Sequence, residues 1–200
     1  MTHAAVNLVP KDKISQDFLV ARGLSIAHYA MLENSLCCLY SHLMGVTEDI
    51  AGIAFFRINN AHSRIIILEK LLKKKHGDAF NVFWNSLKTH LKDLDSTRNN
   101  VVHWATSTSM NIDLPTNQQV TSLVLIPPNF WDKSPNTPEI TIGGLYDFTI
   151  KCDFFARFIN TFNWEIGGGW IKKEEPVSEI YLQPITYPPQ DNHPLNRQPT

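Results

Sequence analysis

The sequence predicts a mostly α-helical bundle of four to five helices, with a small β-strand insertion and an irregular C-terminal tail. Apolar residues recur every three or four positions through most of the first 105 residues and again over residues 145–162, which is typical of amphipathic helices. Residues 106–144 are rich in Thr, Asn and Pro and contain two β-prone runs. Six of the twelve prolines follow residue 167, where no periodicity remains.

Two long helices are predicted in the first 75 residues. The first covers about Ile14–Met44, and Gly45 stands where a helix is expected to stop. Thr47 is followed by two acidic residues and resembles an N-cap, so a second helix is predicted from there toward Lys75. The pair Asn59–Asn60 is a candidate interruption of this second helix.

A third helix is predicted over about Phe80–Leu94, where the apolar spacing is again helical. The run Asp95-Ser96-Thr97 offers three capping residues in succession. These caps predict that a short fourth helix begins there and continues to about Ala105.

The β-prone runs Val120–Ile126 and Glu139–Ile142 predict a strand pair or small hairpin, after which helical spacing returns over residues 145–162. The predicted organisation is one helical domain over residues 1–166, with the β insertion at about 106–144, and a Pro-rich tail over 167–200 that is extended, disordered or wrapped around a neighbour.

Composition limits the kinds of partner. The chain has 18 Lys and Arg against 19 Asp and Glu, a net charge of −1, so no global basic field draws it onto nucleic acid or an anionic membrane. Any contact with nucleic acid must therefore be local. No stretch approaches the roughly 18 continuous apolar residues of a membrane span. The three cysteines cannot form a disulfide framework, so reduced thiols, a cytoplasmic location and no membrane contact are predicted.

Common catalytic and cofactor motifs are absent from the sequence. It contains no phosphate-binding GxxxxGK[ST], no GxGxxG after a strand, no HExxH, no CxxC and no GxSxG. The eight histidines are scattered and have no partners at metal-ligand spacing. The sequence thus predicts neither a metal site nor a cofactor, and it argues against classical hydrolases, kinases and dehydrogenases.

One polar segment, from Asp95 to Trp104, is distinctive. Asn99 and His103 are four residues apart and so share a helix face, which the long side chain of Arg98 can also reach. A predicted helix N-terminus at this point would favour anions. Cleavage of RNA without metal needs a base for the 2′-hydroxyl and a cation for the charge on the phosphorane, and His103 and Arg98 provide these groups.

This segment, Arg98-Asn99-Asn100-Val101-Val102-His103, resembles the Arg-polar-x3-His signature of the HEPN superfamily. The similarity covers roughly residues 14–165, since that family also places its signature late in an α-helical bundle, although the 106–144 insertion is not part of its minimal pattern. The resemblance implies a homodimeric, metal-independent endoribonuclease that leaves a cyclic phosphate. It also implies a role in stress or defence as a toxin, with a protein partner such as an antitoxin.

Carried over to this chain, the resemblance assigns Arg98 to stabilise the phosphate, His103 to act as base or acid, and Asn99 to orient them. Trp104 is a candidate to stack an RNA base, and Asn100 is a candidate substrate contact. The looser pattern of Arg followed by His occurs three times, at Arg22…His28, Arg57…His62 and Arg98…His103. Asn follows the Arg directly only at Arg98.

Other interpretations of the same residues remain open. Arg98 can instead pair with Asp95, and His103 can pack beside Trp104, in a purely structural role. The bundle can also be a non-catalytic module that binds a nucleotide or a protein, or a helical adaptor.

Two smaller patterns concern packing. Glu33 is a candidate partner for an arginine on the second predicted helix, in an ion pair that organises the bundle. The aromatic stripe Phe148, Phe155 and Phe162 is expected to form core or a dimer interface.

Overall fold

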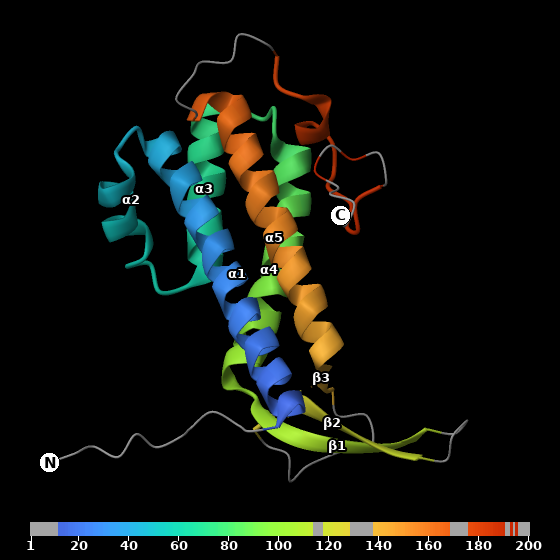
Figure 1. The fold of residues 1–200 in the computed structure, drawn as a ribbon. Helices are drawn as coiled ribbons and strands as arrows, with labels where there is room; N and C mark the ends of the chain where they lie inside the picture. Colours follow the sequence, from blue (N-terminus) through green and yellow to red (C-terminus); the bar gives the residue numbers. More distant parts are fainter. Residues whose placement is uncertain are drawn as a thin grey trace, which may run out of the picture. The chain divides into compact units, whose positions relative to one another are not determined.

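The computed structural model describes residues 12–113, 118–128, 138–168, 176–190, 193 and 195. Its described part is mostly helical with a small antiparallel sheet, which confirms the predicted fold class (Figure 1). The main elements are α1 (Lys13–Met44), α2 (Glu48–Phe55), α3 (Ala61–His76), α4 (Asn81–His103), β1 (Ala105–Asp113), β2 (Gln118–Ile126), β3 (Ile140–Thr141) and α5 (Ile142–Asn163). Two short turns follow, η2 (Trp164–Gly168) and η3 (Glu179–Tyr181). No helix in the described ranges is both long enough and apolar enough to cross a membrane.

The chain divides into two compact units. Unit 1 comprises the described parts of Met1–His28 and Thr97–Ile150, and unit 2 comprises those of Tyr29–Ser96 and Lys151–Thr200. Helices α1, α4 and α5 each contribute residues to both units. The sheet and the segment resembling the HEPN signature therefore belong to unit 1, whereas α2 and α3 belong to unit 2.

The sheet of unit 1 has the strand order β1-β2-β3 and is antiparallel throughout. Strand β1 pairs with β2 along its full length, from Ala105 opposite Ile126 to Asp113 opposite Gln118. The predicted pairing of the two β-prone runs is confirmed, although β2 and β3 pair over only two residues. Strand β1 was not predicted, because its Ala-Thr-Ser-Thr-Ser start has no apolar alternation to mark a half-buried strand.

Helix α4 corrects the predicted break at Asp95. It is one helix of 23 residues, and the run Asp95-Ser96-Thr97 lies within it. Leu94 and Val101 are both buried and stand seven residues apart, so the apolar face continues across the three capping residues. The Asp95 carboxylate accepts a hydrogen bond from Tyr29 Oη at 2.9 Å instead of capping a new helix. Tertiary packing thus overrode the local preference for a cap.

The predicted interruption at Asn59–Asn60 is confirmed, since α2 ends before it and α3 begins after it. Asn60 is the N-cap of α3, and its Oδ1 accepts hydrogen bonds from the backbone N–H of His62 at 2.8 Å and of Ser63 at 3.4 Å. Within unit 2, Arg64 Nη1 lies 2.5 Å from Glu33 Oε1, which confirms the expected ion pair between α1 and the second predicted helix.

The core of unit 2 is aromatic. Phe83 on α4 is fully buried, and its ring centroid lies 4.7 Å from that of Phe162, 5.8 Å from that of Phe158 and 5.5 Å from that of Tyr181. Phe155 and Phe162 are fully buried here, and Phe148 is buried in unit 1, so the predicted aromatic stripe forms core.

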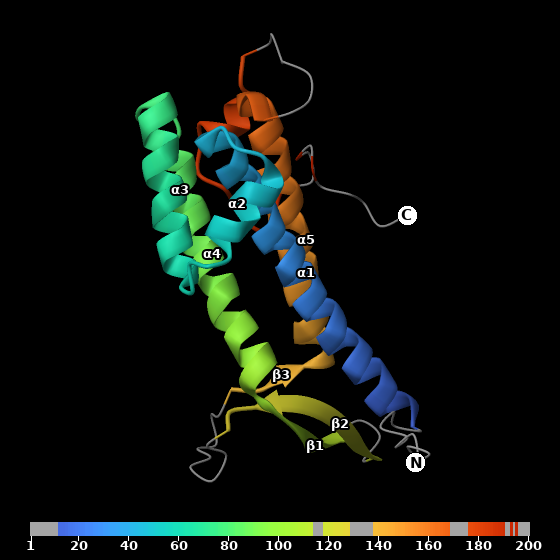
Figure 2. The same cartoon turned by 90° about the vertical axis from the view of Figure 1, so that its left-hand side faces the viewer.

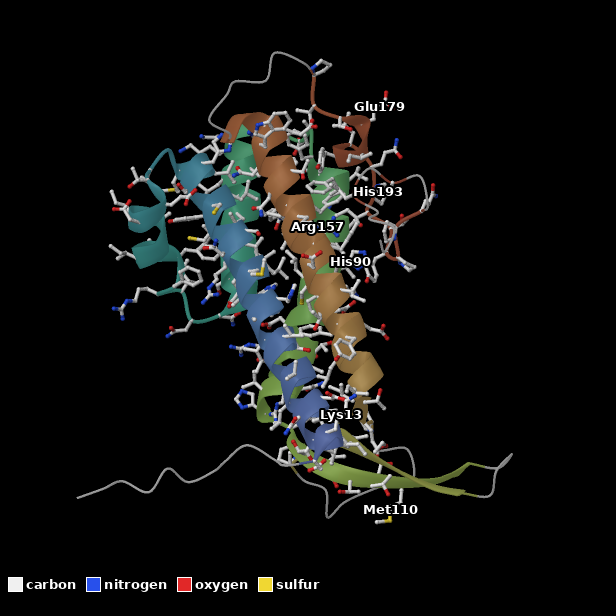
Figure 3. The ribbon with its side chains drawn as sticks, viewed as in Figure 1. Lys13, His90, Met110, Arg157, Glu179 and His193 are labelled. Carbon is white, nitrogen blue, oxygen red and sulfur yellow. The ribbon has the colours of Figure 1, made fainter. Side chains whose placement is uncertain are left out.

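The described part of the tail packs on the helices of its own unit. Tyr181 is fully buried, and Ile185 exchanges two hydrogen bonds with Ser86 on α4, through its N–H at 2.9 Å and its carbonyl at 3.1 Å. Arg157 on α5 donates to the Leu195 carbonyl at 2.9 Å. Figure 3 shows His193, Arg157 and His90 along the side of unit 2 that carries this segment. The tail is irregular, as predicted, but these residues are tied to the bundle.

Candidate functional site at the carboxyl end of α4

The residues of the HEPN-like signature lie in the last turns of α4, near its carboxyl end. Helix α4 ends at His103, and the N–H of Trp104 donates to the Asn100 carbonyl at 2.9 Å. The prediction that the signature begins at a helix N-terminus, whose free N–H groups favour anions, is therefore wrong. The end of a helix instead presents unpaired carbonyls, which favour cations.

Arg22 on α1 supplies that cation within unit 1. Its Nε donates to the Val101 carbonyl at 2.9 Å, and its Nη2 donates to the carbonyls of Val102 at 3.0 Å and Trp104 at 3.2 Å. Its Nη1 also donates to Thr106 Oγ1, at the start of β1, at 3.4 Å. One half-buried guanidinium thus satisfies the terminal carbonyls of α4 and fixes the turn into the sheet.

The role of Arg22 was not predicted from the sequence. Cations at helix ends are a known preference, but this arginine stands about 80 residues away from the carbonyls it binds. In the sequence, Arg22 was singled out only as part of the looser pattern of Arg followed by His, at Arg22…His28. No local pattern could have connected it with the end of α4.

The three predicted catalytic side chains are accessible to different degrees. Asn99 and His103 are exposed, and Arg98 is partly exposed. Residues four apart in an α-helix differ by about 40° around the axis and about 6 Å along it, so Asn99 and His103 share one face. Arg98 Nη1 donates to Asn99 Oδ1 at 3.0 Å, which holds the guanidinium beside that face.

The structure also describes the two predicted substrate contacts and the residues of the alternative, purely structural interpretation. Asn100 and Trp104 are both partly exposed in the same stretch of chain. Asp95, the alternative partner of Arg98, accepts a hydrogen bond from Tyr29 Oη. His103 is exposed, which leaves its ring available to a ligand.

A buried polar cluster holds α1 to α5 within unit 1. Ser25 Oγ lies 2.9 Å from the Ala21 carbonyl, 3.0 Å from the Leu145 carbonyl and 3.1 Å from Thr149 Oγ1. Ser25 is fully buried, so each of these groups would lose a partner that water cannot replace if the serine were removed. The cluster stands less than one turn from Arg22 on α1 and so helps to position the capping guanidinium.

The described residues contain no group of three or more His, Cys, Asp or Glu side chains that could hold a metal ion. No protein-family model, curated protein or solved structure matches the chain. The side chains at the site offer an imidazole that can accept or donate a proton, a guanidinium that can bind a phosphate, and amides that can orient both.

Proposed function

We propose that the protein is a metal-independent endoribonuclease of HEPN type, with its active site on the carboxyl end of α4. The observation that carries the proposal is the exposure of Asn99 and His103 on one helix face, with the Arg98 guanidinium hydrogen-bonded to Asn99 beside them. A base and a cation on one accessible surface are the two groups that RNA cleavage without metal requires.

In the proposed reaction, the His103 imidazole takes the proton from a ribose 2′-hydroxyl. The 2′-oxygen attacks the adjacent phosphorus, and the bond to the 5′-oxygen breaks as that oxygen takes up a proton. The products are a 2′,3′-cyclic phosphate and a 5′-hydroxyl. Arg98 stabilises the charge on the phosphorane, Asn99 orients Arg98, Trp104 stacks a base, and Asn100 contacts the substrate.

Arg22 has an electrostatic part in this proposal. The carboxyl end of a helix carries a partial negative charge of roughly half an elementary charge, which would repel a phosphate. The Arg22 guanidinium binds three of the carbonyls that create this charge. Arg22 is thus a positioning residue that makes the end of α4 compatible with an anionic substrate.

The proposed setting is a cytoplasmic homodimer in which His103 of a second copy donates the proton to the leaving oxygen. RNA is the substrate, and a protein such as an antitoxin restrains the enzyme in a stress or defence role. A non-catalytic binding module is the second candidate. It is favoured by the continuity of α4, because the signature lacks the anion-binding helix N-terminus that the sequence predicted.

The test is incubation of purified protein with total RNA and labelled oligonucleotides in EDTA. Wild type should cut and leave cyclic phosphate ends, and His103→Ala and Arg98→Ala should each lose roughly 100-fold or more of the rate. Arg57→Ala is the matched control, because Arg57 is exposed and has the same spacing to a histidine. Equal cleavage by wild type and His103→Ala would overturn the assignment, and no cleavage by wild type would favour the binding module.

A further inference from the structure

One face of α2, in unit 2, is apolar although it is in contact with water. Ile53 is 72% exposed, Ile50 is 54% exposed, and Phe56, the residue that follows the helix, is 44% exposed. Single exposed apolar side chains are ordinary, but neighbouring ones on one helix mark an interaction surface. Figure 2 shows α2 on the side of unit 2 that faces the viewer.

The opposite face of α2 anchors the helix, so the exposed apolar face cannot be buried by rotating it. Ala51 and Phe55 are fully buried. The Phe55 ring centroid lies 5.5 Å from that of Tyr40 on α1 and 5.3 Å from the guanidinium carbon of Arg64 on α3. Turning α2 to bury Ile53 would expose the Phe55 ring to water and break these contacts. The apolar face is therefore a fixed feature of unit 2.

Exposed residues of opposite charge stand at the two ends of this face. Asp49, Ile53 and Arg57 are four residues apart, and the residue after α2 keeps helical dihedrals, so the three follow one another along the face. Hydrogen bonds from the Thr47 hydroxyl and the Ile50 N–H hold the pKa of Asp49 below its ordinary value, so this carboxylate is charged at neutral pH. Among the residues that the structure describes, the side chain of Arg57 has no hydrogen bond or ion pair.

This order of acid, apolar centre and base is complementary to itself. A two-fold axis at Ile53 sets two copies of α2 antiparallel, because a two-fold contact uses the same patch on both subunits. Asp49 and Arg57 each stand four residues from Ile53, so the axis brings the carboxylate of each copy level with the guanidinium of the other. Ile50 and Phe56 each stand three residues from the axis, so the centre of the contact is apolar. A carboxylate accepts several hydrogen bonds, so Asp49 can bind a guanidinium in addition to its present donors.

We propose that two copies of the chain associate through this face, with their α2 helices antiparallel. The face comprises Asp49, Ile50, Ile53, Phe56 and Arg57. An anionic lipid surface is a poorer occupant, because it would repel the Asp49 carboxylate. The inference goes beyond the proposed nuclease: the face lies in unit 2, whereas the pairing proposed there involves His103 in unit 1, and it does not require that the protein cleave RNA.

The contact is expected to be weak. Helix α2 has 8 residues and so spans roughly 12 Å. A face of this length is small beside the roughly 1,200 Å² of total area that a stable interface buries. We therefore expect a contact that is open in dilute solution and closes at micromolar or higher concentrations of the chain.

The test is sedimentation velocity of the full chain from micromolar to nearly millimolar concentrations, which measures self-association. Ile53→Asp and Arg57→Asp should each weaken the association of the wild type at least tenfold, because the first places two carboxylates at the axis and the second leaves Asp49 facing a carboxylate. Val82→Asp is the matched control, since Val82 is an exposed apolar residue of α4 in the same unit and should associate as wild type does. An association through His103 in unit 1 would persist in all these variants, so the comparison isolates the α2 contact.

An exchange of charges separates this contact from any other use of the face. Asp49→Arg and Arg57→Asp each bring like charges together at both ends of the two-fold contact, so neither variant should associate alone. In an equal mixture of the two variants an arginine faces an aspartate at both ends, so association should return. All of these positions are exposed, so the variants are expected to fold, and circular dichroism checks this.

Three results would overturn the inference. The first is sedimentation of wild type and Ile53→Asp that is equal at every concentration. The second is a mixture of Asp49→Arg and Arg57→Asp that associates no better than either variant alone, since the charges would then not meet. The third is binding of wild type, but not of Ile53→Asp, to phosphatidylserine vesicles without self-association, which would assign the face to a lipid surface.

Discussion

Packed aromatic rings form the core of unit 2, whereas in unit 1 hydrogen bonds to backbone carbonyls fix the end of α4. In unit 2, the rings of Phe83, Phe158, Phe162 and Tyr181 contact one another and are almost completely buried. In unit 1, the groups that fix the end of α4 are the Arg22 guanidinium and, nearby on α1, the buried Ser25 hydroxyl. The end of α4, where the proposed active site lies, is therefore held by directional bonds as well as by the buried Val101.

The two kinds of interaction respond differently when a side chain is substituted. Apolar packing is spread over many weak contacts, so its loss scales with the volume removed. A hydrogen bond to a carbonyl is lost as a whole when its donor is removed, and a buried partner is then left unsatisfied. Substitutions in unit 2 should thus change global stability, and substitutions at Arg22 should change the local order of the proposed site.

The largest expected effect is at the centre of the aromatic core. Phe83→Ala should lower the free energy of unfolding by about 3–5 kcal/mol, because it removes a fully buried ring with four aromatic neighbours. Urea unfolding measures this value. Ile53→Ala is the control, since that side chain is 72% exposed and should change stability by less than about 0.5 kcal/mol. Similar losses for the two variants would contradict the packing described for unit 2.

A smaller effect is expected for Arg22→Ala. Loss of the hydrogen bonds to the carbonyls of Val101, Val102 and Trp104 should cost about 1–3 kcal/mol. Hydrogen exchange should quicken at the last turn of α4 and the start of β1 while unit 2 keeps its protection.

Arg22→Lys sharpens this result, because a lysine keeps the charge but loses the planar set of donors, so it should restore protection only in part. Unchanged exchange at the end of α4 in Arg22→Ala would show that Arg22 does not hold this turn.

The smallest effect per residue is expected for the pH dependence of the free energy of unfolding. The histidines responsible for it lie in unit 2. Burial lowers the pKa values of His42, His76, His90 and His193 below the ordinary value of 6.5. Below about pH 6.5 the unfolded chain therefore binds protons on these histidines more readily than the folded chain does. Stability should be fully present above that pH and should fall as the pH drops through the lowered pKa values.

Urea unfolding at pH 7.5 and pH 5.5 tests this pH dependence. His90→Gln should reduce the difference between the two pH values, because burial of the His90 imidazole against Phe155 lowers its pKa. A stability that rises on acidification from pH 6.5 would contradict the expected loss.

Much of the fold could be predicted because its signals are local. The apolar spacing of α1 and α5, the end of α1 at Gly45 and the Asn60 cap of α3 each depend on residues within a few positions of one another. The signature Arg98-Asn99-x3-His103 is local too, so its residues could be identified before their surroundings were known. Their roles in RNA cleavage and the association of two copies stay predictions.

The remaining features depend on contacts between distant segments. Asp95 lies inside α4 because Leu94 and Val101 continue one buried face and Tyr29 binds the carboxylate, so the signature stands at the end of a helix rather than at its start. Arg22 meets its carbonyls across about 80 residues of chain, and Ile185 meets Ser86 across 99.

The local sequence was enough to specify which segments are helical, because propensity and periodicity act over a few residues. Tertiary contacts set which caps are used and where polar groups find their partners, because a buried donor or acceptor is satisfied by whichever group folding brings to it.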